Sequence, residues 1–231
     1  MKKIILSVVM LVLMTCGTVF AKENSPNWIK NLDAAKNANQ IFVVAGIGQT
    51  TAWISMHEKN SAGNWEQIMT TPGFIGQNGL EKIDENDGKT PSGIFYFNKA
   101  FGIAENPGCA VDYVKVDENI YWSGDKNCKY NQLVDIRNYK NLNKNVSEHL
   151  IETNPEYKYA LNISYNEEGI SEKGFAIFLR CFGEIKPFTG GGIAIPEDKM
   201  LFVIKNVKKD CVVVIDYLKN LSPEAYAKLN L

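Results

Sequence analysis

Short apolar runs, separated by polar stretches rich in glycine, predict a protein built mainly of β-strands. The first run is the β-branched segment 41–45, and the second, 51–59, alternates apolar and polar positions. A Gly63-Asn64 turn separates 51–59 from a third strand over 65–69, which predicts a hairpin at the start of a sheet. One face of 51–59 holds Ala52, Ile54 and Met56, and the other holds Trp53, Ser55 and His57.

Four more strands and several short helices complete the predicted elements. The strands are expected over 93–97, 159–165, 175–181 and 211–217. Helices are expected over 27–37, from Ser147, over 196–207 with Pro196 in the first helical position, and from Ser222. Since no repeat or internal linker interrupts the pattern, it predicts one α+β domain dominated by β-strands.

A polar segment, 98–156, lies in the middle of the chain and is too long for an ordinary connection. It carries scattered aromatic residues, among them Tyr121, Trp122 and Tyr130. A segment of this length is expected to contain short elements of its own or to serve a function. These aromatic residues could line a cleft for a sugar or a peptide, but aromatic side chains in a compact β domain are more often part of the core, and we assign none of them individually.

The first 21 residues have the layout of a secretory signal peptide. Lys2 and Lys3 precede an apolar run over 4–14, and the small residue Ala21 offers a cleavage site. The run is too short for a comfortable transmembrane helix. We therefore expect export to the periplasm or cell wall and no membrane span in the mature chain. The alternative is a lipoprotein in which Cys16 is modified.

Composition and charge narrow the classes of function. With 45% hydrophobic and 22% charged residues over 231 positions, the chain is neither disordered nor a polytopic membrane protein. Its formal net charge of -1 argues against a nucleic-acid partner. The chain has two histidines, His57 and His149, and no cluster of metal ligands, so neither a metal nor another cofactor is expected.

Four cysteines follow the predicted signal peptide, and an oxidising compartment permits disulfides among them. Cys109 and Cys128 both lie in the polar segment, which makes them the candidate pair. Cys181 and Cys211 border apolar runs, and we interpret them as buried free thiols.

The most informative stretch combines an apolar strand with a glycine turn. Residues 175–181 read Phe-Ala-Ile-Phe-Leu-Arg-Cys, and 189–197 read Thr-Gly-Gly-Gly-Ile-Ala-Ile-Pro-Glu. This pair resembles the signature of the L,D-transpeptidase (YkuD-like) catalytic domain, in which Phe-Leu-His ends the strand and Thr-Ala/Gly-Gly-Cys forms the turn. Further landmarks of that family stand in the same order: Asp87-Gly88-Lys89-Thr90-Pro91-Ser92-Gly93, Ala100-Phe101-Gly102-Ile103, Asn106-Pro107-Gly108, Tyr121-Trp122, Tyr130-Asn131-Gln132, Ser147-Glu148-His149-Leu150 and Tyr165-Asn166.

The resemblance covers about residues 40–216. It implies an L,D-transpeptidase-like β-sandwich or barrel with short flanking helices, preceded by an extension over 22–39 and followed by a helical tail over 217–231. It also implies an exported enzyme of peptidoglycan maturation. In such an enzyme a cysteine thiolate attacks the stem peptide after its third residue, a diamino acid. A histidine moves the proton, and backbone N–H groups stabilise the oxyanion.

Both catalytic positions of that family are substituted in this chain. Arg180 stands at the histidine position and Gly192 at the cysteine position. Glycine has no nucleophile, and arginine stays protonated, so it cannot act as a general base. In a well-studied serine protease, loss of the nucleophile costs about 10⁶-fold in rate. We therefore expect the fold without intact catalytic residues.

The sequence offers no evident substitute for the missing pair. Cys181 adjoins Arg180, whose charge would favour a thiolate, but neighbouring residues on a strand point to opposite faces. We interpret His149 as a surface or packing residue at a helix start, and His57 as an ordinary strand residue.

The retained residues suggest a binding site instead. Thr189, Gly190, Gly191 and Gly192 present successive backbone N–H groups near the cationic Arg180, an arrangement that binds anions. Because arginine grips a carboxylate with two parallel hydrogen bonds, the hypothesis is a site for the carboxylate of a stem peptide. The competing interpretation is a vestigial turn in which Arg180 pairs with a nearby acid.

Three functions remain open on the sequence alone. The first is a catalytically silent envelope protein that binds peptidoglycan stem peptides or another cell-wall protein. The second is an active peptidoglycan transpeptidase that uses other residues, and the third is an interaction module without a ligand. The choice among them depends on the site rather than on the fold.

Overall fold

The computed structural model describes residues 23–183 and 186–229. Its larger sheet contains ten strands. They are β1 (Glu23–Asn24), β2 (Gln40–Gly46), β3 (Thr51–Lys59), β4 (Trp65–Phe74), β5 (Gly93–Gly102), β6 (Tyr113–Lys115), β10 (Ala160–Ile163), β11 (Phe178–Cys181), β12 (Ile193–Ile195) and β13 (Val212–Tyr217). The smaller sheet has three strands, which are β7 (Ile120–Trp122), β8 (Leu133–Asp135) and β9 (Glu148–His149).

The helical segments are short. The α-helices are α1 (Glu197–Asn206), α2 (Leu218–Leu221) and α3 (Pro223–Ala227). The 3-10 helices are η1 (Ile29–Asn31), η2 (Asp33–Lys36), η3 (Lys144–Val146), η4 (Leu150–Glu152) and η5 (Glu156–Lys158). The prediction of a β-dominated α+β chain is therefore confirmed.

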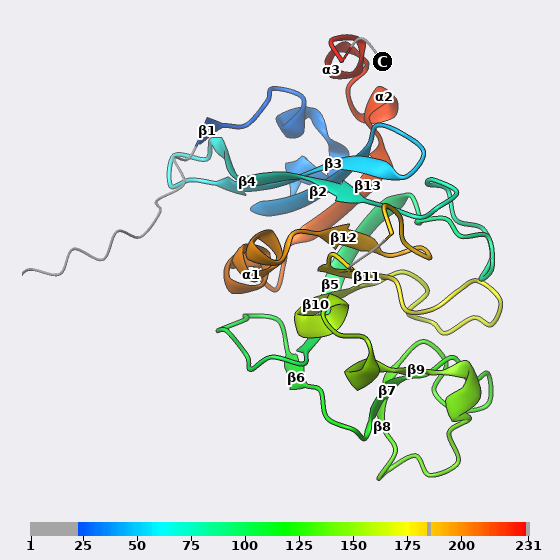
Figure 1. The fold of residues 1–231 in the computed structure, drawn as a ribbon. Helices are drawn as coiled ribbons and strands as arrows, with labels where there is room; N and C mark the ends of the chain where they lie inside the picture. The colour runs from blue at the N-terminus through cyan, green and yellow to red at the C-terminus, as the bar shows by residue number, and fades with distance from the viewer. Residues whose placement is uncertain (1–22, 184–185, 230–231) are drawn as a thin grey trace, which may run out of the picture.

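The larger sheet closes on itself. Its strands follow the order β1-β4-β12-β11-β10-β5-β13-β2-β3, and β3 also pairs with β4. Eight strands therefore form a ring, to which β1 and β6 are attached (Figure 1). The pairs β2–β13 and β11–β12 are parallel. Closure gives each strand of the ring one face toward a common interior.

The interior of the ring holds the main hydrophobic core. From β3 come Ala52, Ile54 and Met56, which is the face that the alternation predicted. Helix α1 adds Met200 and Val203 to the same core, and all five side chains are fully buried. The period-two pattern of β3 therefore records which face of the strand points inward.

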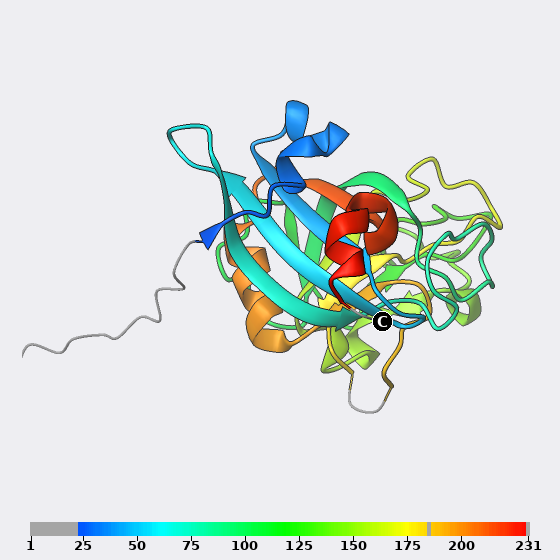
Figure 2. The ribbon, with the colours of Figure 1, turned by 90° about the horizontal axis from the view of Figure 1, so that it is seen from above.

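The outer face of β2 and β13 is buried as well, under the two ends of the described chain. Ile41 and Val43 of β2 pack with Ile29 of η1 and with Leu218 of α2. Figure 2 shows the N-terminal helical turns and helices α2 and α3 lying over this part of the sheet. Burial on both faces explains why 41–45 is apolar throughout instead of alternating.

The polar segment 98–156 folds largely beside the ring, around the three-stranded sheet β8-β7-β9 (Figure 1). A separate core joins it to the ring, and in that core the rings of Trp122 and Phe178 pack edge to face with centroids 4.8 Å apart. Tyr121, Trp122 and Tyr130 are all buried, so of the two possibilities that the sequence left open these three belong to the core.

Two predicted helices take other forms. The helix start expected at Ser147 is wrong, because Glu148 pairs with Trp122 in the antiparallel ladder between β9 and β7. Tertiary pairing thus overrides the local sequence pattern. The helix expected over 27–37 forms the two separate 3-10 turns η1 and η2.

Two predicted boundaries also move. Pro196 is the N-cap of α1 rather than its first helical residue. Strand β11 begins at Phe178 instead of Phe175, and Ala176 just before it has a φ of 57°. A left-handed backbone at that residue is incompatible with a continuous strand.

The predicted N-terminal extension is tied to the ring from Glu23 onward. Strand β1 pairs with β4, and the Ser25 hydroxyl lies 2.8 Å from Nδ1 of His57. On the other side of the imidazole, Nε2 lies 2.8 Å from the Ser55 hydroxyl. His57 is fully buried on β3, and this burial lowers its pKa to about 4. The ring is therefore neutral at pH 7.

The predicted signal peptide and Cys16 lie outside the described residues. Within 23–183 and 186–229, no helix has the length and apolar character that a membrane span requires.

We predict that His57 makes the fold sensitive to acid. An unfolded histidine takes up a proton near pH 6.5, whereas folded His57 does so only near pH 4. The unfolded state therefore binds more protons in this window, and stability falls as the pH falls. The loss attributable to His57 is about 3 kcal/mol between pH 7 and pH 4.

The measurement is urea unfolding of the wild type and of His57→Gln across that pH range. The difference in unfolding free energy between the two proteins should shrink by that amount toward pH 4. The variant His149→Gln keeps His57 and should retain the acid sensitivity. A constant difference between wild type and His57→Gln would refute the assignment.

Candidate functional site

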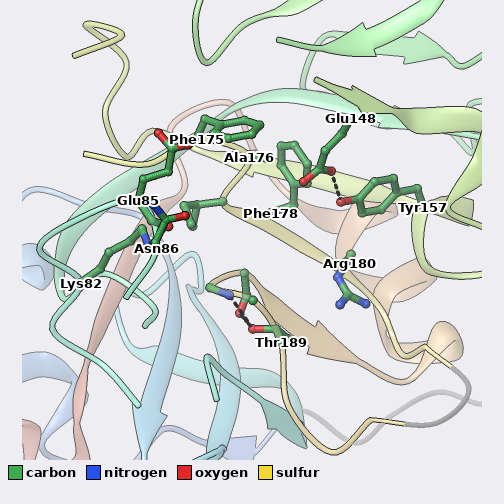
Figure 3. A pocket seen from close by; sticks show the side chains of 14 residues that line it. Lys82, Glu85, Asn86, Glu148, Tyr157, Phe175, Ala176, Phe178, Arg180 and Thr189 are labelled. Atoms are coloured by element: carbon green, nitrogen blue, oxygen red, sulfur yellow. Dashed lines mark hydrogen bonds between the residues drawn. The ribbon is translucent and has the colours of Figure 1, made fainter. Parts of the chain in front are cut away.

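Strand β11 and the glycine turn that follows it line one cavity, as the sequence predicted. The cavity has a volume of about 330 Å³ and contains Arg180 together with Thr189, Gly190, Gly191 and Gly192. Its remaining walls come from the loop 82–86, from Glu148 and Tyr157, and from residues 175–178. Figure 3 shows Arg180 between the Glu148–Tyr157 pair and Thr189.

Strand geometry separates Arg180 from its neighbour Cys181. The side chain of Arg180 lines the cavity, whereas Cys181 is 1% exposed and belongs to the main core. Burial raises the pKa of the Cys181 thiol to about 11. The thiol is therefore protonated at neutral pH and faces away from the cavity, as alternation on the strand predicted.

Threonine hydroxyls fix the glycine turn. The carbonyl of Gly192 accepts hydrogen bonds from the hydroxyl of Thr189, at 2.6 Å, and from that of Thr90, at 3.2 Å. The Thr189 hydroxyl in turn accepts a hydrogen bond from the backbone N–H of Gly191 at 3.1 Å. Gly191 has a φ of 150°, which a side chain would strain. The predicted run of free N–H groups is therefore shortened, because that of Gly191 is already engaged.

Position 192 leaves no room for a side chain. A Cβ atom built on Gly192 would lie 2.7 Å from the carbonyl oxygen of Phe178 and 3.3 Å from its nitrogen. Backbone atoms do not move aside as a flexible side chain does, so even alanine requires a shift of the turn or the strand. A Cβ on Gly190 would meet nothing within 4 Å.

Arg180 has an acidic partner close by. Its Nη1 lies 3.4 Å from Oε1 of Glu156 and donates a hydrogen bond to the carbonyl of Cys181 at 3.0 Å. The side chain is 15% exposed. It also borders a second cavity of about 350 Å³, which shares Thr189 and Gly190 with the first. Arg180 therefore stands between two neighbouring cavities, with donors beyond those that Nη1 uses.

Glu148 is the acid that the sequence reasoning did not single out, although it lies within one of the quoted landmarks. Its Oε2 accepts a hydrogen bond from the Tyr157 hydroxyl at 2.5 Å. Burial raises the pKa of the Glu148 carboxyl, against the opposing effects of that hydrogen bond and of the Arg180 charge. Only the pairing of β9 with β7 brings Glu148 to the cavity, so no local pattern could have identified it.

The loop 82–89 forms the wall of the cavity across from Arg180, and the carboxylate of Asp87 holds this loop together. This carboxylate pairs with Lys82 at 2.9 Å and accepts backbone N–H groups from Ile83, Asp84 and Lys89. Burial acts to raise the pKa of Asp87, but these hydrogen bonds outweigh it and lower the pKa to about 2. The side chains of Lys82 and Asp87 are 2% and 9% exposed, so the pair is buried.

The remaining cysteines do not enter the site. Cys109 and Cys128 are free thiols in the structure rather than the expected disulfide, and they pack in different clusters. Burial raises the pKa of Cys109 and of Cys211 above the ordinary thiol range. Among the described residues, no cysteine lines the cavity.

The two histidines are likewise structural. The ring of His149 stacks on Tyr121 with centroids 4.2 Å apart, and its nitrogens contact Glu152 and the carbonyl of Glu118. His149 is thus a packing residue, and His57 is a strand residue, as interpreted. In the described part of the chain, no group of histidine, cysteine and acidic residues could hold a metal ion.

No protein-family model matches the chain, and no curated protein matches it. Two crystal structures of the helical cell shape determining protein Pgp2 from Campylobacter jejuni, one of them a mutant, resemble it with TM-scores of 0.40 and 0.39. The sequence identities are 15% and 18%, and the matches cover 78% of this chain. The chain spans about half the length of those structures, with 48% of each covered.

We predict that the Asp87 carboxylate is a main support of the cavity wall. Asp87→Asn leaves Lys82 buried without a counter-charge, which should lower the free energy of unfolding by about 3 kcal/mol. Asp33→Asn, which breaks an exposed pair with Lys36, should leave it unchanged within error. Denaturant unfolding of the three proteins tests this, and equal effects of both substitutions would contradict it.

A second prediction compares two glycines of the same turn. Gly192→Ala should lower the free energy of unfolding by about 1–3 kcal/mol, because its Cβ meets the Phe178 backbone. Gly190→Ala should change it by no more than about 0.5 kcal/mol. Thermal or urea unfolding distinguishes the two. If both variants are equally stable, position 192 tolerates a side chain.

Proposed function

We propose that this is an exported, cell-wall-associated protein that has the L,D-transpeptidase fold and binds peptidoglycan stem peptides without cutting them. In this proposal residues 1–21 are the signal peptide, 22–39 an extension, 40–216 the transpeptidase-like domain and 217–231 a helical tail. The observation that carries it is a single cavity lined by both Arg180 and Gly192. The sequence resemblance assigns these two residues to the family's two catalytic positions.

Catalytic silence is supported by what lines this cavity. The turn at Gly192 has no space for a nucleophilic side chain, and Arg180 cannot accept a proton from one. The thiol next along the chain, Cys181, is protonated and packed in the core. The mechanism of that family requires a cysteine nucleophile and an adjacent histidine, and the described residues of the wall include neither a cysteine nor a histidine.

Peptide binding is supported by the placement of Arg180. It is largely buried between two cavities, and its contact with Glu156 at 3.4 Å is long for a charge-assisted hydrogen bond. A ligand carboxylate can therefore compete for the guanidinium without first breaking a tight pair. The interpretation of Arg180 as a cation paired with an acid describes the unliganded state in this proposal.

Absence of catalysis is tested by mixing the protein with disaccharide-tetrapeptide muropeptides and reading all species by mass spectrometry. The expected result is unchanged muropeptide masses from a protein shown to be folded. Loss of the terminal residue, a cross-linked product or an acyl-protein mass would show an active enzyme that uses other residues, and only the cross-linked product would make it a transpeptidase.

Binding is tested on the same muropeptides by calorimetry with two arginine variants. Arg180→Ala should weaken the affinity about tenfold or more, because a charge-assisted contact to the carboxylate is lost. Arg137→Ala is the matched control, since Arg137 is the chain's only other arginine and pairs with Asp135 away from the cavity. An unchanged affinity in Arg180→Ala would remove Arg180 from the site.

A further inference from the structure

The charges around the cavity are not balanced. Each cation of the wall has an acidic partner that does not itself line this cavity: Lys82 pairs with Asp87 at 2.9 Å, and Arg180 pairs with Glu156 at 3.4 Å. Glu85 and Glu148 also line the wall, and within 23–183 and 186–229 neither makes an ion pair. With both carboxylates ionised, the wall therefore carries negative charge that no cation of the wall pairs with.

Tyrosine hydroxyls hold both of these glutamates. Tyr130 donates to Oε2 of Glu85 at 2.6 Å, and Tyr157 donates to Oε2 of Glu148 at 2.5 Å. In the described part of the chain, Oε1 of Glu148 accepts no hydrogen bond. It is also not one of the polar atoms that are buried without a partner, so it is accessible from the cavity. Figure 3 shows Glu148 and Glu85 on opposite sides of the cavity. Each carboxylate is thus anchored through one oxygen and has a second oxygen for a ligand.

Glu148 is the more rigid of the two. The ring of Tyr157 packs edge to face against Phe178 and Phe101, with centroids 5.5 Å and 5.7 Å apart, so its hydroxyl is held by the core. Strand pairing with Trp122 fixes the backbone of Glu148. A carboxylate held in this way has little freedom to lose when a ligand arrives.

We propose that the cavity takes a primary ammonium group of its ligand on Glu148, in addition to the carboxylate that Arg180 receives. This inference rests on the proposed function and narrows the ligand to a peptide that carries a free amine, such as a stem peptide with its diamino acid unblocked. The Arg180 charge only partly offsets the cost of burying the Glu148 carboxylate, and a ligand ammonium in direct contact supplies the paired charge that it lacks among the described residues. The raised pKa of Glu148 agrees with a site that is incomplete when empty.

The test compares two ligands that differ only in the amine. One is a disaccharide-tetrapeptide muropeptide whose diamino acid carries its free amine, and the other is the same compound after acetylation of that amine. Calorimetry with the wild-type protein should show at least tenfold tighter binding of the free-amine compound, because the charge-assisted contact to Glu148 is lost on acetylation.

Two variants then assign the effect to one residue. Glu148→Gln should bind both compounds with the affinity that the wild type has for the acetylated one. Glu152→Gln removes the same charge four residues away, from an exposed side chain that does not line the cavity, and should keep the tenfold preference. The wild-type comparison of the two ligands stands even if Glu148→Gln does not fold.

The outcomes separate this inference from the function on which it rests. If neither compound binds, the proposed function fails and the ammonium site fails with it. If both compounds bind the wild type equally, or if Glu148→Gln keeps the preference, the ammonium site is wrong while peptide binding stands.

Discussion

Closure of the larger sheet through the pairing of β3 with β4 is the constraint from which the rest of the structure follows. In a closed ring every strand has an inner face and an outer face. The inner face must be apolar, whereas the outer face is either packed against other segments or exposed to solvent. The outer face of β2 and β13 is covered by the two ends of the described chain, and that of β11 is covered in part by the segment 98–156. On β11 the same rule sends Cys181 into the core and Arg180 into the cavity.

The cavity is therefore a joint product of the ring and of the polar segment beside it. The ring supplies Arg180 and the clamped turn at Gly192, whose carbonyl is held by Thr90 and Thr189. The polar segment supplies Glu148. The segment is long enough to form its own small sheet, which places this residue at the cavity. The charge of the cavity comes from both parts. Its two cations pair with acids outside the wall, and within the described residues its two glutamates make no ion pair.

Position 192 shows how closely the glycine turn packs against strand β11. With glycine there, the turn lies against the Phe178 backbone more closely than any side chain permits. Under the proposed function, position 192 therefore lacks both a nucleophile and the space for one. In the proposed function this closed turn serves as a rigid wall beside Arg180, and binding replaces chemistry.

Features that depend on neighbouring residues along the chain could be predicted from the sequence. Alternation in 51–59 identified the buried face of β3, and the motif pair 175–181 and 189–197 brought Arg180 and the glycine turn together correctly. Other features could not be predicted, because they depend on pairing and packing between segments that are far apart in the sequence. Ser147 and Glu148 resemble a helix start locally, yet pairing with β7 makes a strand there and carries Glu148 to the cavity. Likewise, Cys109 and Cys128 share a polar segment but pack in separate clusters, so proximity in sequence did not become proximity in space. Periodicity reports which way a side chain points, whereas the charge balance of a cavity is decided only when distant segments are packed together.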